Sequence, residues 1–137
     1  YVDDWSEVLE HAIKIEKELR LDKADTFQKF ATGINEIKNK FQSLIIKLKQ
    51  DGNTIAAYGA PAKATTLLYH FGIDSSIIDF IVDDSALKQG LYSPGKHIPI
   101  LSPEAIYQKK PNYLIILAWN FTEEILKKQL EEITFSI

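Results

Sequence analysis

The chain has 137 residues, enough for one domain or for one domain with an appendage. Hydrophobic residues make up 45% and charged residues 26%, a balance typical of a globular protein and not of a disordered one. The net charge is -3 and neither half is a basic patch, so we expect neither a nucleic acid nor a membrane surface as partner.

The chain contains no cysteine, which excludes a disulfide, a thiolate zinc site and a cysteine nucleophile, and which fits a reducing cytoplasm. No stretch reaches the roughly 18 apolar residues of a membrane span, and the first residues do not resemble a signal peptide. Because the chain begins at Tyr1 and contains no methionine, we expect it to be a fragment or a processed piece of a longer protein. The absence of cysteine leads us to expect a cytoplasmic location.

The first fifty residues have the apolar period of helices. Apolar side chains recur at three- and four-residue steps up to Leu19 and again from Phe27 to Leu48, on either side of a polar break at 22–26. Gly52 is suited to the left-handed cap that ends a helix. We therefore predict a helical pair over 1–52, packed on a missing domain or on a second chain. The face expected to be buried carries Phe30, Ile34, Ile37 and Phe41.

From residue 53 onward, short apolar runs alternate with helical stretches. Strands are expected at 54–58, 77–82, 98–100, 112–119 and 134–137, and helices at 62–71, from 102–104 onward and at 121–132. Continuous apolar strands between helices indicate a parallel sheet that is covered on both faces. The sequence predicts an α/β fold, with a small doubly wound, Rossmann-like parallel sheet over 53–137.

A glycine-bearing turn joins the first expected strand to the first helix of this sheet. It contains Gly59, Ala60 and Pro61, followed by Lys63 and Thr65 in the first helical turn. Such a turn directs backbone N–H groups and the positive end of the helix dipole toward the space above the sheet, where phosphate binds. Lys63 would add charge and Thr65 a hydroxyl. The turn predicts a phosphate site, and a purely structural turn is the alternative.

Other candidate binding residues follow the later strands. Asp83 ends the second strand, where an acid can bind ribose hydroxyls, although an acid there can equally cap a loop. Lys88 and His97 lie in the loop over the strand ends, where ligands of open sheets bind. Trp119 and Asn120 end the strongest strand, where the indole is placed to stack on a base or sugar, or to pack on the sheet rim.

No metal-ligand spacing is present, and the serine, histidine and aspartate residues form no nucleophile elbow. A glycine-rich loop of the kind that binds S-adenosylmethionine is also absent. We therefore assign neither a catalytic residue nor a metal ligand within this chain.

Several of these segments, in this order, resemble one known family. The runs are YGAPAKATTLL at 58–68, DFIVD at 79–83, LKQG at 87–90, PGKHIPILSP at 94–103 and LAWN at 117–120. Together they resemble the C-terminal domain of the sugar C-methyltransferases, over about residues 53–132. The preceding helical region also looks like the segment that leads into this domain in that family.

The resemblance implies a larger enzyme, with an N-terminal zinc-binding domain and a central domain that binds S-adenosylmethionine. It implies that a nucleotide-linked sugar lies between the central and C-terminal domains, and that the acid/base residues belong to the central domain. The chain itself would supply only the nucleotide-sugar side of the cleft. Two other hypotheses stay open at this point: a stand-alone sensor or accessory domain that binds a nucleotide sugar or coenzyme A without methyl transfer, and a helical dimerisation module.

Overall fold

The computed structural model describes the backbone of residues 5–134 and the side chains of residues 5–129. The chain forms two compact units, a helical unit, Tyr1–Lys40, and a sheet unit, Phe41–Ile137. The domain division that the sequence predicts, at residue 52, stays a prediction.

The two expected N-terminal helices are present, as α1, Trp5–Glu18, and α2, Ala24–Gln50. Gly52 follows α2 with a φ of +81°, the left-handed conformation expected of it. The expected burial of one face is wrong, because Phe30 is 69% exposed and Ile37 is 62% exposed, and Ile34 and Phe41 are only half-buried. An apolar period identifies a helix, but burial needs a second surface that the period does not supply.

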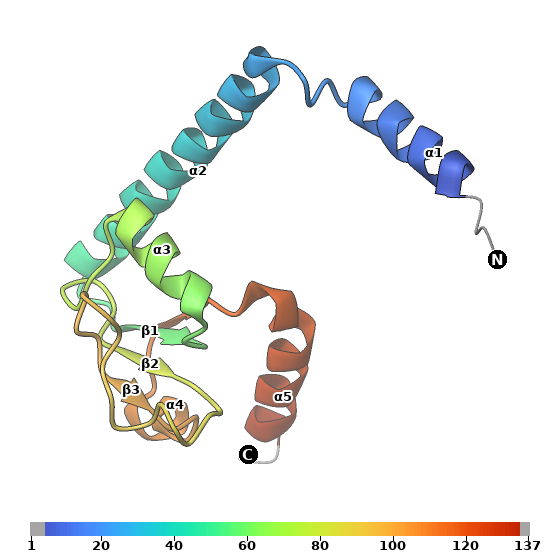
Figure 1. Ribbon diagram of the computed structural model, residues 1–137. Helices are drawn as coiled ribbons and strands as arrows, with labels where there is room; N and C mark the ends of the chain where they lie inside the picture. The colour runs from blue at the N-terminus through green and yellow to red at the C-terminus, as the bar shows by residue number, and fades with distance from the viewer. Residues whose placement is uncertain (1–4, 135–137) are drawn as a thin grey trace. The chain divides into compact units, whose positions relative to one another are not determined.

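The sheet has four strands: β1, Ile55–Tyr58; β2, Phe80–Val82; β3, Ile100–Leu101; and β4, Tyr113–Ile116. Their order is β3-β2-β1-β4, and every pair of neighbours is parallel. Figure 1 labels β1, β2 and β3, which lie side by side. The predicted α/β fold with a parallel sheet, preceded by helices, is therefore confirmed.

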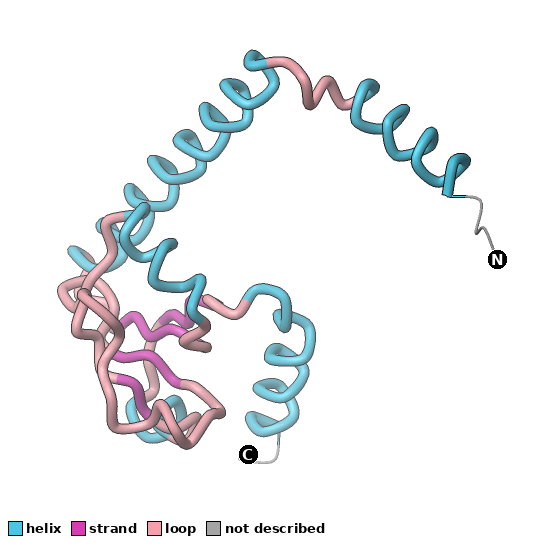
Figure 2. Tube along the Cα trace, in the orientation of Figure 1, coloured by secondary structure: helices cyan, strands magenta, loops and turns pink. Residues whose placement is uncertain are grey.

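The helices of the sheet unit are α3, Ala62–Phe71; α4, Ala105–Lys109; and α5, Thr122–Thr134. The short 3-10 helix η1, Trp119–Phe121, precedes α5. Figure 2 shows that the long connection between β2 and β3 consists of loop and turns. The bounds of α3 agree with the helix predicted at 62–71, and Gly72 caps it with a φ of +64°.

Several predicted bounds are wrong. The strand expected at 77–82 begins only at Phe80, because residues 74–78 form a turn in which the N–H groups of Ile77 and Ile78 bond to the carbonyl of Asp74. The strand expected at 112–119 ends at Ile116, and the helix expected from 102–104 begins at Ala105. Of the strand expected at 134–137, residue 134 belongs to α5 and the rest lies outside the described residues.

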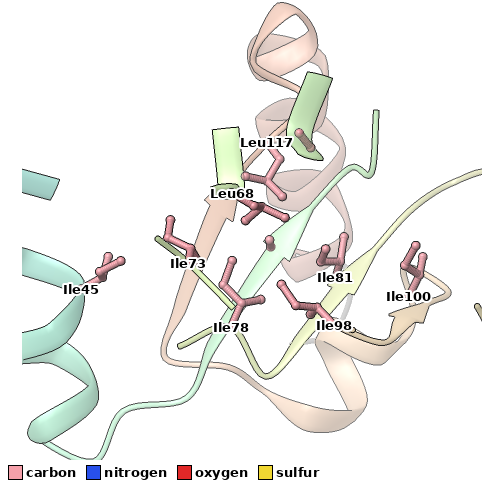
Figure 3. Packing of buried hydrophobic residues seen from close by; sticks show 10 residues of the cluster. Ile45, Leu68, Ile73, Ile78, Ile81, Ile98, Ile100 and Leu117 are labelled. Atoms are coloured by element: carbon pink, nitrogen blue, oxygen red, sulfur yellow. The ribbon is translucent and has the colours of Figure 1, made fainter. Parts of the chain in front are cut away.

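Both faces of the sheet are covered, which explains why all four residues of β1 are buried. On one face, Ala57 and Ile81 pack with Ala64 and Leu68 of α3, two positions four residues apart on one helical face. Figure 3 shows Ile81 and Leu68 within this cluster. On the other face, side chains of β1 and β2 pack with Ala105 of α4 and Ile125 of α5. The members of the second cluster in the strands are Ala56, Tyr58, Phe80 and Val82.

The last turns of α2 belong to the sheet unit. Ile45 is 3% exposed within the core, and the ring of Phe41 meets that of Phe71 edge to face at 5.5 Å. The side-chain amide of Gln42 donates a 2.6 Å hydrogen bond to the carbonyl oxygen of Phe71. Lys49 forms a 2.6 Å ion pair with Asp79. These contacts attach the end of α2 to the end of α3 and to the residue before β2.

Strand order reverses at β1, which places β2 on one side of it and β4 on the other. In open parallel sheets, the crevice at the carboxyl ends of the strands beside such a reversal is the usual place for a ligand. The site should therefore lie where β1, β2 and β4 end. In the part of the chain that the structure describes, no helix combines the length and the apolar character needed to cross a bilayer.

Candidate functional site

The turn after β1 is held tightly against the end of β4. Gly59 has a φ of +88°, and a Cβ atom at this position would lie 2.5 Å from the Cβ of Ala118. The N–H of Gly59 donates to the carbonyl of Val82 at 2.7 Å, and the N–H of Leu117 donates to that of Tyr58 at 2.9 Å. Both the conformation and the space at residue 59 therefore require glycine.

Asp83, at the end of β2, holds this turn from the other side. Its Oδ2 accepts hydrogen bonds from the N–H of Ala60 at 2.6 Å and from Lys88 Nζ at 3.0 Å. Its Oδ1 accepts the N–H of Ser85 at 2.9 Å, and the residue is 8% exposed. Asp83 thus makes its contacts with the turn and with the loop that follows β2.

The pKa of Asp83 reflects this arrangement. Burial alone raises the pKa of the carboxyl group, because the charged form loses its hydration. The hydrogen bonds from Ala60, Ser85 and Lys88 favour the carboxylate, and together they bring the pKa below its ordinary value. The group is therefore ionised at neutral pH, and its charge is paired with the ammonium group of Lys88 at 3.0 Å.

Helix α3 begins directly after the turn. Pro61 occupies the N-cap position in extended conformation, and no side chain caps the helix there. The N–H of Ala64 donates to the carbonyl of Pro61 at 2.9 Å, so the N–H groups of residues 62 and 63 are the ones that a ligand above the strand ends would use. Lys63 lies in this turn, and its Nζ is 4.2 Å from the ring centroid of Trp119. The structure therefore brings together Lys63, which the sequence placed in the first helical turn, and Trp119, which it placed at the end of a later strand.

A cavity of about 400 Å³, here called the sheet-edge cavity, opens at the ends of β1, β2 and β4. Its lining comes from the turn, from the two acids after β2, from the end of β4 and from α5. The lining residues are Tyr58, Gly59, Pro61, Asp83, Asp84, Lys88, Ala118, Phe121, Glu124, Ile125 and Lys128.

Of the predicted site residues, Gly59, Pro61, Asp83 and Lys88 line the sheet-edge cavity. Ala60 and Thr65, together with Pro61 and Lys88, line a second cavity of about 230 Å³ beside α3, here called the α3 cavity. His97 is exposed, and it lines neither of these two cavities. Asn120 is likewise exposed and outside both linings, next to Trp119 in η1. A ligand contact at any of these residues stays a prediction.

Sequence reasoning missed a hydrogen-bonded group in the sheet-edge cavity. The hydroxyl of Tyr58 donates to Asp84 Oδ2 at 3.0 Å, and Lys128 Nζ donates to Asp84 Oδ1 at 2.7 Å. Asp84 follows Asp83 directly, so its position at a strand end was a usable signal. Lys128 is 44 residues away on α5, and no local pattern connects it with Asp84.

The pKa values of Tyr58 and Lys128 in this group are shifted from their ordinary values. Burial raises the pKa of Tyr58, and the hydrogen bond to Asp84 raises it further, so the hydroxyl stays protonated at neutral pH. The hydrogen bond to Asp84 also raises the pKa of Lys128. The cavity thus presents a fixed hydroxyl, carboxylate and ammonium group beside the apolar side chains of Phe121 and Ile125, a lining suited to a polar ligand with one apolar face.

Among the residues that the structure describes, no three or more His, Cys, Asp or Glu side chains form a group that could hold a metal ion. The cavity-lining residues supply hydrogen-bond donors, acceptors and charges. The arrangement is thus equipped to bind and orient a ligand.

Comparison with known proteins agrees with the residues quoted from the sequence. A family model described as the C-methyltransferase C-terminal domain matches residues 2–134. The C-methyltransferase NovU of Streptomyces niveus is 37% identical over 105 residues, which cover 77% of this chain and 25% of the relative. The chain thus spans about a quarter of the length of that relative. We conclude that this chain belongs to the family of C-methyltransferase C-terminal domains.

Proposed function

We propose that this chain forms the nucleotide-sugar side of the active-site cleft in a methyltransferase that uses S-adenosylmethionine and acts on a nucleotide-linked deoxysugar. Family membership and the similarity to a C-methyltransferase support the reaction class. The observation that carries the binding role is the turn at Gly59 and Pro61, which lines the sheet-edge cavity at the strand-order reversal and leads directly into α3, whose first turn carries Lys63.

The diphosphate of the ligand is proposed to lie on this turn. The N–H groups at the start of α3 and the dipole of that ten-residue helix favour an anion there. Lys63 adds a positive charge, and the ring of Trp119 that it contacts is a weaker partner than a phosphate oxygen. Asp83 supports the turn from below by fixing the N–H of Ala60, and the sugar would enter the sheet-edge cavity beside Asp84 and Lys128.

The residues of this chain do not fit S-adenosylmethionine. The turn after β1 has Pro61 and Ala62 where a glycine-rich cofactor loop would need further glycines, and Asp83 is engaged by Ala60, Ser85 and Lys88. We therefore assign the cofactor, the methyl-transfer acid/base groups and any zinc to segments outside these residues. The 137-residue chain alone is expected to show no methyltransferase activity, and calorimetry with S-adenosylmethionine should show no stoichiometric binding.

The competing function is an accessory or sensor domain that binds coenzyme A. Both ligands carry a diphosphate, so the turn would serve either one. Titrations with a thymidine diphosphate sugar, a uridine diphosphate sugar and coenzyme A under the same conditions discriminate between them. The proposed function requires a nucleotide sugar to bind more tightly than coenzyme A.

The decisive test uses amide chemical shifts of the labelled chain during titration with a thymidine diphosphate sugar. Shifts should occur at Gly59, Ala60 and Lys63. Lys63→Ala should weaken binding roughly ten- to a hundredfold, because a charge-assisted hydrogen bond contributes about 1.5–3 kcal/mol.

Lys47→Ala, an exposed lysine on α2, is the matched control and should leave the affinity unchanged. Shifts confined to residues 5–40, or equal affinities for the Lys63→Ala and Lys47→Ala variants, would overturn the diphosphate site.

A further inference from the structure

The α3 cavity lies next to the sheet-edge cavity, since Pro61 and Lys88 line both. It encloses about 230 Å³ between α3 and the segment 88–100. Lys88 is held at this boundary by its 3.0 Å contact with Asp83. The two cavities therefore flank the turn that is proposed to hold the diphosphate.

The walls of the α3 cavity are mainly apolar. Leu68, Ile81 and Ile100 are buried, and Ala64 leaves space above the first turns of α3 because its side chain is small. Leu91 and Tyr92 also line the cavity, and they are 56% and 63% exposed. An aromatic ring and an apolar side chain are thus accessible at the mouth, a combination that suits a flat ring system.

One buried polar side chain lies in this lining. Ser93 is 5% exposed, and its hydroxyl oxygen accepts the N–H of Ile98 at 3.0 Å. That bond uses the hydroxyl as an acceptor, and a serine hydroxyl can also donate one hydrogen bond. A ring with a carbonyl oxygen at its edge would satisfy this donor, whereas a purely aliphatic ligand would leave it unused.

We infer that the α3 cavity binds the planar base of the nucleotide ligand. This inference rests on the proposed function, because the diphosphate on the turn brings the nucleoside to one side and the sugar to the other. The base lies between the apolar walls and Tyr92, and a ring carbonyl accepts from Ser93. Lys88, at the boundary of the two cavities, faces the ribose and the diphosphate.

The first experiment compares three probes on the labelled 137-residue chain: thymidine, inorganic pyrophosphate and thymidine diphosphate. Thymidine should shift the amides of Ala64, Leu91 and Ser93, and pyrophosphate should shift those of Gly59 and Lys63. Thymidine diphosphate should shift both sets. Thymidine shifts outside the α3 cavity would overturn the inference and leave the diphosphate site standing. Absence of pyrophosphate shifts at Gly59 would instead overturn the proposed function.

Substitutions at Tyr92 test the contact with the base. Tyr92→Ala should weaken the binding of thymidine diphosphate by about fivefold to a hundredfold, the range expected when one ring that stacks on a base is lost. Tyr92→Phe keeps the ring and should bind within about twofold of the original chain. Pyrophosphate should bind both variants equally. Equal nucleotide affinity in Tyr92→Ala and Tyr92→Phe would overturn the stacking contact.

A second pair of variants tests whether a substitution in this loop changes the affinity without a contact to the base. Leu91 lines the cavity, whereas Leu87 on the same loop is 89% exposed and outside the lining. Leu91→Ala should weaken the binding of thymidine diphosphate by about threefold to tenfold, because an apolar contact is lost. Leu87→Ala should leave this affinity unchanged. The same loss in both variants would show that the loop acts without contact to the base, and the inference would fail.

Discussion

The carboxylate of Asp83 lies 2.6 Å from the backbone nitrogen of Ala60 and accepts its hydrogen bond. This contact ties the end of β2 to the turn after β1, although the residues are 23 positions apart in the chain. Lys88 approaches the same carboxylate at 3.0 Å, so one side chain organises both the turn and the following loop. The geometry makes Asp83 a support of the proposed diphosphate site.

Replacing Asp83 by alanine should lower the free energy of unfolding by about 2 kcal/mol, because the N–H of Ala60 and that of Ser85 lose their acceptor. Chemical denaturation near neutral pH measures this loss. Asp51→Ala removes an exposed aspartate after α2 and should have little effect. Equal losses in the two variants would contradict the supporting role.

The stabilisation by Asp83 should also depend on pH. Its pKa is lower in the folded chain than in the unfolded chain, so the stabilisation is complete above the unfolded carboxyl pKa of about 3.9. It is lost as the pH falls through the lower, folded pKa. The stability difference between the original chain and Asp83→Ala should therefore shrink in acid, and a difference that grows below about pH 4 would contradict this assignment.

Gly59→Ala should destabilise the chain by about 2–4 kcal/mol, because the added Cβ would clash with Ala118 and the backbone would keep a positive φ. Gly33→Ala is the matched control, since a Cβ there meets nothing within 4 Å in the middle of α2. That change should raise helix stability by about 0.5–1 kcal/mol. Thermal melting followed by circular dichroism measures both changes, and tolerance of alanine at residue 59 would show that the turn is not closely packed.

Two isoleucines of α2 should respond differently to a charge. Ile45→Asp places a carboxylate in the core of the sheet unit and should cost several kcal/mol, about 3 or more. Ile37→Asp lies at a 62% exposed position and should change the stability by about 0.5 kcal/mol or less. Urea denaturation of the two variants measures the contrast. A large loss in Ile37→Asp would show that another surface covers this face of α2.

Asp84→Asn should lower the pKa of Tyr58, because the carboxylate that opposes phenolate formation is removed. The pKa should stay above the ordinary tyrosine value, since burial is the largest cause of its rise. Carbon-labelled tyrosine titrated by NMR gives this pKa, with Tyr58→Phe identifying the signal. Glu123→Gln makes the same charge change at an exposed position on α5 and should shift the pKa less.

The same raised pKa predicts the effect of alkali on stability. The stabilisation from the neutral Tyr58 hydroxyl is complete below the unfolded tyrosine pKa of about 10, and it is lost as the pH rises through the higher, folded pKa. Tyr58→Phe should therefore lose less stability than the original chain above about pH 10. An equal loss of stability in the original chain and in Tyr58→Phe above about pH 10 would contradict the raised pKa of Tyr58.

Much of the fold follows from local signals. The helix at Ala62–Phe71 has the bounds that its residues predict, because Pro61 precedes it and Gly72 can take the left-handed cap. Apolar runs between helices identify the parallel sheet, because only strands covered on both faces are apolar throughout. The turn at Gly59 was recognised as a candidate site for the same reason, since a strand, a glycine and a helix start occur together in sequence.

Tertiary structure decided how these segments meet. The strand order places Ala118 against Gly59, and the packing of α5 places Lys128 against Asp84; no spacing along the chain encodes either contact. The sequence could not predict that Phe30 and Ile37 are exposed. Periodicity identifies an apolar face of a helix, but it does not say whether another surface covers that face. Short-range hydrogen bonds and steric limits act between neighbours in the chain, whereas strand order and cavities depend on which distant surfaces pack together.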